Sequence, residues 1–304
     1  MQKKIFTGTT LFAAAIFILT VCCGPSYGRE LDKFKLSAGV KGYASSGISE
    51  TSLYYCPYVE TGYSGDLFSV MPSLSQFRDY QVTDGSGNYE LINFFEAGCA
   101  LSLYPWEFLG IDIEYFYSSG DMEYLSSDMK GGIVLDFRKT AFTVQYSRRN
   151  SQYSFNGADI TAERNVLFFE LNYYMKENRS IDLSFDRRSD IYDSLDYDYS
   201  QNTIRAGMSY VSDRSVIVLG GIFAGMDSAD YAIAGADMGV SVRIKGHVKL
   251  TLTGRISHYA APLSVKSSGS GGTSGSKTNP FLQTSSVGES YTEKSASLGA
   301  AWIL

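Results

Sequence analysis

The chain has 304 residues, 44% hydrophobic and 14% aromatic, and carries a formal net charge of −6 at pH 7. This composition excludes a disordered chain, and the acidic balance argues against a nucleic-acid partner. With two histidines and four cysteines there is little material for a metal centre, so we expect no metal and no cofactor.

The amino terminus, residues 1–28, is predicted to be a cleaved export signal. Two lysines precede an apolar run over 11–21, which is too short to span a bilayer. Small residues three and one positions before Arg29 complete the pattern that a signal peptidase accepts. Two alternatives stay open, a retained membrane anchor and a lipoprotein modified at Cys22.

The rest of the chain, 29–304, is predicted to be one all-β domain, because apolar and polar residues alternate along it with period two. In the run 109–117, for example, Ile111, Ile113 and Tyr115 alternate with Asp112 and Glu114. We expect about twelve strands, and most approach the roughly 9–11 residues that a tilted strand needs to cross a bilayer. The expected strands are 34–41, 95–103, 109–117, 133–137, 142–146, 167–173, 181–186, 203–210, 216–222, 236–243, 248–256 and 293–304.

The connections between these runs alternate between short and long. The expected long ones are 46–88, 120–128, 149–161, 189–200, 224–231 and the Ser/Gly-rich 260–289. This asymmetry is typical of up-and-down transmembrane β-barrels, which have short periplasmic turns and long outer loops. A secreted β-sandwich is the alternative fold.

The strand count has two alternatives, ten or fourteen. Ten follow if 216–222 and its neighbour are misread, and fourteen follow if 53–70 forms a further hairpin, against which Pro57 argues. The stretch 67–77 also allows a short helix.

The last strand, 296–304, alternates apolar residues up to the carboxyl terminus. In this feature and in its overall pattern over 33–304, the chain resembles the porin-like β-barrel proteins of the bacterial outer membrane. The resemblance implies an outer-membrane location, contact with lipid, and insertion by the barrel-assembly machinery through the last strand. Proteins of that family usually end in Phe or Trp, whereas this chain ends in Leu304 with Trp302 two places earlier.

If the apolar set faces lipid, the opposite set faces the lumen and carries charge of two signs on two sides. The expected acidic wall contains Glu96, Asp112, Glu114, Asp136, Glu170, Asp182 and Asp186. The expected basic wall contains Lys35, Lys41, Arg205, Arg243, Lys249 and Arg255, with Asp237 and Glu293 as exceptions. Such opposed charges produce a field across a water-filled pore, which predicts a narrow passive channel for small polar or charged solutes. A scaffold plugged by paired charges is the alternative.

A second hypothesis is an adhesin or receptor that binds a host surface molecule through its outer loops, above all the tyrosine-rich 46–88. We expect no enzymatic activity. His258 stands near the outer rim, but Ser257 points to the other face; Asp190 and Asp196 are the conceivable acidic partners. Cys56 and Cys99 are expected not to form a disulfide.

Overall fold

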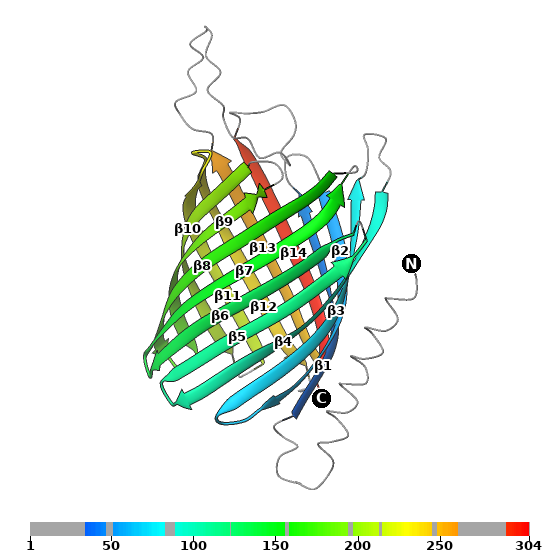
Figure 1. Ribbon diagram of the computed structural model, residues 1–304. Coiled ribbons are helices and arrows are strands. Elements are labelled where there is room, and N and C mark those ends of the chain that lie inside the picture. Colours follow the sequence, from blue (N-terminus) through cyan, green and yellow to red (C-terminus); the bar gives the residue numbers. More distant parts are fainter. Residues whose placement is uncertain are drawn as a thin grey trace. The chain divides into compact units, whose positions relative to one another are not determined.

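The computed structural model describes residues 34–46, 51–82, 89–121, 123–155, 158–193, 197–212, 215–244, 248–260 and 290–303. These residues form 14 antiparallel strands that close into a barrel (Figure 1). The predicted export signal and most of the Ser/Gly-rich 260–289 lie outside the described residues. Among the described residues, no helix has the length and apolar character to span a membrane.

The strands are long and follow one another along the chain. Their bounds are β1 Phe34–Ser46, β2 Thr51–Ser64, β3 Phe68–Val82, β4 Tyr89–Trp106, β5 Leu109–Gly120, β6 Leu125–Phe137, β7 Thr140–Phe155, β8 Ala158–Lys176, β9 Arg179–Tyr192, β10 Tyr197–Ser212, β11 Val216–Asp227, β12 Ala232–Ile244, β13 Val248–Ala260 and β14 Tyr291–Ile303.

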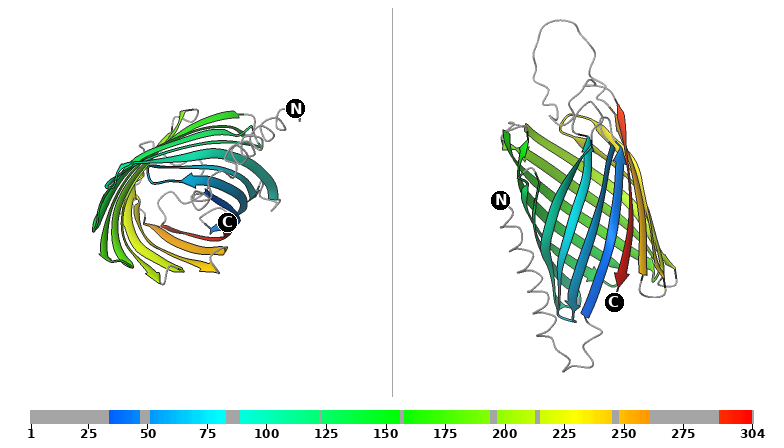
Figure 2. Two further views of the ribbon diagram at one scale, coloured as in Figure 1. Left: turned by 90° about the horizontal axis from the view of Figure 1, so that it is seen from below. Right: turned by 90° about the vertical axis from the view of Figure 1, so that its right-hand side faces the viewer.

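Each strand pairs with its neighbours in sequence, and β1 pairs with β14, for example Gly39 with Ala301, to close the ring. One closed sheet excludes the two-sheet sandwich. The start of β1, the end of β14 and the tight turns such as 107–108 and 138–139 lie at the lower end of Figure 1. Figure 2 shows the strands tilted in the same sense around the ring, as closure of a barrel requires.

The expected count of about twelve strands is corrected to fourteen, which was one of the alternatives. The extra pair is the hairpin of β2 and β3, which replaces both the expected loop 46–88 and the expected short helix 67–77. The pairs of this hairpin skip Pro57, between Tyr55–Arg78 and Tyr58–Ser75, and continue in the same register. A proline that lacks its N–H is therefore accommodated without a shift of register.

The outward face of the barrel is apolar at mid-height, as the alternation predicts. In β5 the outward side chains of Ile113, Tyr115 and Tyr117 are 46–51% exposed, while Asp112 and Glu114 turn inward and are less exposed. Aromatic side chains gather outside near the short turns, where the rings of Trp106, Phe108 and Phe137 stack. This is where an interfacial aromatic girdle is expected in a membrane barrel.

At the opposite end, the strands continue into segments that were expected to be loops. β7 has 16 residues and β8 has 19, well beyond the roughly 9–11 that a tilted strand needs to cross a bilayer. The residues between strands reduce from the expected 120–128, 149–161, 189–200 and 224–231 to 121–124, 156–157, 193–196 and 228–231. We call this continuation of the barrel wall, residues 147–155 of β7, 158–166 of β8 and 187–192 of β9, the outer extension.

Candidate functional site: the barrel lumen

A cavity of about 660 Å³ lies inside the barrel, against one part of its wall. Strands β13, β14 and β1 form one side of this lumen cavity, and β2 to β5 form the other. Alternation places one side chain in two from each strand on the lumen, which explains the polar lining. The lining includes Lys41, Cys56, Tyr58, Glu60, Ser73, Ser75, Phe77, Glu96, Phe116, Lys249, Thr251 and Ser297.

The charges of the lumen cavity are separated by sign. Lys41 and Lys249 come from β1 and β13, whereas Glu60 and Glu96 come from β2 and β4. None of the four forms an ion pair with a residue that the structure describes. Their charges are therefore available to solutes in the cavity.

Local contacts hold two of these four groups in place. The ammonium nitrogen of Lys41 lies 4.5 Å from the centre of the Tyr58 ring, which is a cation–π contact. The hydroxyls of Ser75 and Ser118 donate hydrogen bonds of 3.5 and 3.2 Å to the two oxygens of Glu96. Hydrogen bonds of this kind orient the carboxylate without removing its charge.

On a different part of the wall, Arg205 of β10 forms a salt bridge that joins side chains from nearby strands. Its Nε and Nη2 donate hydrogen bonds of 2.8 Å each to the two carboxylate oxygens of Asp237 on β12, and Nη1 donates to Asp182 on β9. To reach Asp237 the guanidinium passes over Gly221 of β11, where a Cβ would stand 2.7 Å from the Arg205 Cζ. Gly221 thus provides the space that lets one arginine join carboxylates from strands on either side.

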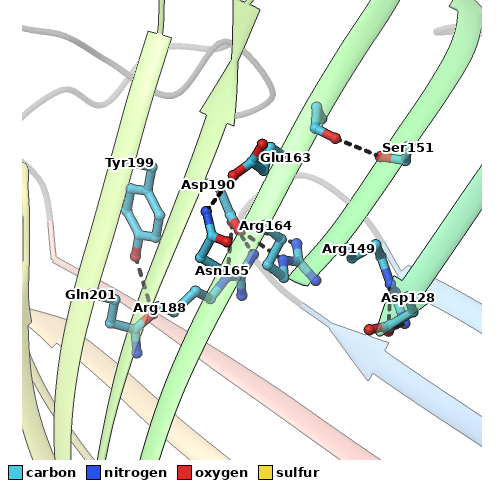
Figure 3. A network of polar contacts seen from close by, with 11 residues as sticks. Asp128, Arg149, Ser151, Glu163, Arg164, Asn165, Arg188, Asp190, Tyr199 and Gln201 are labelled. Carbon is cyan, nitrogen blue, oxygen red and sulfur yellow. Dashed lines mark hydrogen bonds and ion pairs between the residues drawn. The ribbon is translucent and has the colours of Figure 1, made fainter. Parts of the chain in front are cut away.

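In the outer extension, arginines line the lumen (Figure 3). The Nε atoms of Arg164 and Arg188 lie 2.7 and 2.8 Å from different oxygens of Asp190, whose residue is 3% exposed. The Arg149 guanidinium donates two hydrogen bonds, of 2.9 and 2.6 Å, to one oxygen of Asp128. Since two guanidiniums share one buried carboxylate, the group at Asp190 is left with a net positive charge.

Aromatic side chains fill the lumen beside β11 to β14. Phe223, Ile233 and Tyr259 are buried there, and Tyr231 and Tyr291 pack against them. The rings of Tyr259 and Tyr291 stack with centroids 4.5 Å apart. Arg255 covers the Phe223 ring at 4.1 Å from its centroid. The lumen is thus packed with side chains around Tyr259 and Tyr291, whereas the lumen cavity lies further along the same two strands, β13 and β14, beside Thr251 and Ser297.

Comparison by sequence finds no relative: no protein-family model matches the chain, and no curated protein sequence does. Comparison by structure finds similar proteins. The monoaromatic hydrocarbon channel CymD matches with a TM-score of 0.55 and 8% identity, over 89% of this chain and 88% of CymD. The toluene transporter TodX of Pseudomonas putida matches with a TM-score of 0.53 and 9% identity, over 93% and 91% of the two chains. The chain has the fold of the outer-membrane β-barrel channels.

Within this channel fold, the structure brings some of the expected wall residues into contact with partners. Among the acidic residues, Glu114 pairs with Lys130 at 3.0 Å, Asp182 pairs with Arg205, and Glu96 lines the lumen cavity. Asp112, Asp136, Glu170 and Asp186 occupy inward positions of β5, β6, β8 and β9, and form no ion pair with another described residue.

The expected basic residues are distributed along the same interior. Lys41 and Lys249 line the lumen cavity, Arg255 covers Phe223, and Arg243 occupies an inward position near the short turns. Lys35 lies in β1, where the structure describes its backbone and not its side chain.

The sequence prediction missed four inward cations on the side expected to be acidic, namely Lys130, Arg149, Arg164 and Arg188. The last three belong to the outer extension, where neither face is apolar. In β7, for example, Arg148 and Asn150 face outward while Arg149 and Ser151 face inward. Hydrophobic alternation cannot reveal a strand with two polar faces, although plain polar continuity after Tyr146 was a usable signal.

The residues considered for catalysis and for a disulfide lie apart. His258 is on the outward face, with Nδ1 3.1 Å from the Thr292 hydroxyl, whereas Asp190 is on the lumen side. That histidine and that carboxylate therefore cannot act together, and Asp196 lies outside the described residues. Cys56 is buried on the inward face and Cys99 is exposed on the outward face; both thiols are free.

Proposed function

We propose that this protein is a passive channel of the bacterial outer membrane for small polar or charged solutes. The observation that carries the proposal is the lumen cavity, which holds four charges without ion-pair partners among the described residues, inside a barrel with an apolar outer face. Eight strands leave an interior just filled by side chains, and 16 to 18 leave an aqueous channel. Fourteen strands with one packed and one open part of the lumen are consistent with a narrow passage.

The separation of charge supports selectivity within that passage. Lysines on β1 and β13 and carboxylates on β2 and β4 line different parts of the cavity wall, so a solute in the cavity is expected to experience a field between them. Expected solutes are small molecules with polar or charged groups. The hydrocarbon channels share only the fold with this chain.

The outer-membrane location and the assembly route belong to the same proposal. Residues 1–28 are proposed to direct export, and the strand at the carboxyl terminus is proposed to be recognised by the barrel-assembly machinery. Outward apolar side chains such as Leu298 (62% exposed) and Ile222 (68% exposed) support contact with lipid. The receptor hypothesis rested mainly on the expected loop 46–88, of which residues 51–82 form a hairpin in the barrel wall.

Conductance recording in planar bilayers tests the channel. The mature chain is refolded in detergent, and a heat-dependent shift in gel mobility confirms that the barrel has closed. Discrete current steps are expected with the folded protein and not with the same sample after boiling. Absence of steps from protein that passes the mobility test would show that the side chains in the lumen block the passage.

A further inference from the structure

The outer surface of the barrel carries a shallow apolar groove across β7 to β10. It has a volume of about 310 Å³, and its lining includes Phe142, Val144, Phe169, Leu183, Phe185 and Ile204. The rings of Phe169 and Phe185 lie 6.3 Å apart between centroids, and Ile204 is 57% exposed. The groove therefore presents branched and aromatic side chains to whatever surrounds the barrel.

Polar side chains stand on the same four strands directly beyond this groove, toward the outer extension. These residues, the outward polar patch, are Tyr146, Arg148, Glu163, Asn165, Arg187 and Asn202. In the strand registers Arg148 is opposite Asn165, and Arg187 is opposite Asn202. The apolar face thus changes to a polar one within two neighbouring levels of the four strands, because Arg187 is opposite Leu167 of β8 and Arg148 is opposite Asn165.

Contacts order part of the outward polar patch. The Tyr146 hydroxyl donates to Asn165 Oδ1 at 2.6 Å, and Asn165 Nδ2 donates to Glu163 Oε1 at 2.8 Å. Glu163 also accepts a hydrogen bond of 2.5 Å from Arg148. Arg187 is exposed and forms no ion pair with any residue that the structure describes. Arg187 lies apart from Glu163, whose register partner on β9 is Ile191. With two guanidiniums and one carboxylate, the patch carries a net positive charge.

We propose that this face of β7 to β10 is a binding site for an acyl lipid with an anionic phosphate headgroup. An acyl chain would lie in the apolar groove, and the phosphate would be bound by Arg187, with Asn202 beside it. Guanidinium binds phosphate through two parallel hydrogen bonds, which favours arginine in such a site. The proposal rests on the proposed membrane location, because the groove must lie at the depth of the hydrocarbon.

The vertical order of the two parts favours a lipid over a protein partner. An apolar groove below a cationic patch has the same sequence of polarity as a lipid, from chain to headgroup. A contact between two barrels would need a larger matched surface than this groove provides.

Native mass spectrometry of the folded full chain tests the site. The protein is mixed with equal amounts of phosphatidylglycerol and phosphatidylcholine, and the lipid adducts that survive activation are compared. We expect preferential retention of phosphatidylglycerol, which Arg187→Gln lowers by about fivefold, the effect of roughly 1 kcal/mol. Ile204→Trp, which fills the groove, is expected to lower retention of both lipids.

Two matched variants control for general effects. Arg179→Gln removes an arginine near the short turns, beside the ring of Tyr210, and Leu252→Trp adds a ring at an outward position of β13 that is 55% exposed. Both are expected to leave lipid retention unchanged. Equal retention by wild type and Arg187→Gln, or equal losses in the controls, would overturn the site in favour of nonspecific surrounding lipid. If Ile204→Trp changes the oligomeric state and not lipid retention, the groove is a contact between copies.

The two proposals fail separately. Channel steps that persist in Arg187→Gln, together with unchanged lipid preference, refute the lipid site and leave the channel standing. Lipid preference without channel steps in wild type refutes the channel and leaves the lipid site standing.

Discussion

Replacing Arg205 by methionine removes the cation that joins β9, β10 and β12 across the lumen. Methionine keeps much of the side-chain volume and loses the three hydrogen bonds to Asp182 and Asp237. Both carboxylates then face each other's charge without the guanidinium between them. The carboxylates are largely shielded, with side-chain exposures of 12% for Asp182 and 20% for Asp237.

The expected cost follows from these contacts. A hydrogen bond to a charged group contributes roughly 1.5–3 kcal/mol, and removing one partner of a buried pair costs roughly 3–5 kcal/mol. The Arg205 side chain is 24% exposed, so water in the lumen solvates part of the charge that remains. We therefore expect the free energy of unfolding to fall by about 3 kcal/mol.

Urea unfolding of the barrel in lipid vesicles measures this loss, through fluorescence of the two tryptophans and through gel mobility. Arg243→Met is the matched control, because Arg243 points inward and forms no ion pair with a described residue. Arg205→Lys should recover less than half of the loss, since one ammonium cannot bind both carboxylates in the same geometry. Unfolding free energies of Arg205→Met and wild type within about 0.5 kcal/mol would refute the bridge.

Three further predictions concern single positions. Gly221→Leu should destabilise the barrel by about 1–3 kcal/mol in the same unfolding assay, because its Cβ would meet the Arg205 guanidinium, whereas Gly131→Leu, whose Cβ meets nothing within 4 Å, should not. Lys41→Gln should raise the permeability for cations relative to anions about twofold, because a unit charge at about 8 Å in water contributes about 0.5 kcal/mol to the energy of an ion. Glu60→Gln should change this permeability ratio in the opposite direction. Reversal potentials in a salt gradient that are the same in both variants as in wild type would contradict both predictions. Cys99 should react with a lipid-soluble maleimide in vesicles and resist a membrane-impermeant one, and the reverse pattern would place its strand face in water.

The barrel wall could be predicted from the sequence wherever it meets lipid. Residues such as Ile113 and Tyr115 alternate with carboxylates because each strand there separates hydrocarbon from water. The alternation of apolar and charged residues in the sequence therefore predicts these strands. In the outer extension both faces of a strand are polar, and there the predicted strands ended too early. Arg148 and Arg149 face opposite sides of one strand, and both meet polar surroundings.

The charge arrangement of the lumen was only partly predictable for a related reason. The period-two alternation of polar and apolar residues predicts which side chains point inward, and it places Arg205 and Asp182 on one side of the sheet. The alternation does not predict that Gly221 of β11 lets Arg205 reach Asp237 on β12. The hairpin β2–β3 was predicted only as an alternative, because Pro57 normally marks a break in a strand. In the structure the pairing resumes after Pro57 in the same register.

The outer extension frees part of the wall from the demands of a bilayer. Outward positions there, such as Asn150, need only allow the strand ladder to continue, so charged and bulky substitutions should cost little. An epitope or fluorophore attached at Asn150 would stand on an exposed face of the β-sheet and, under the proposed outer-membrane location, would be reachable by an antibody from outside the cell. The outward residues of the outer extension can therefore be substituted, which changes the exposed surface, while the strands that carry them remain in place.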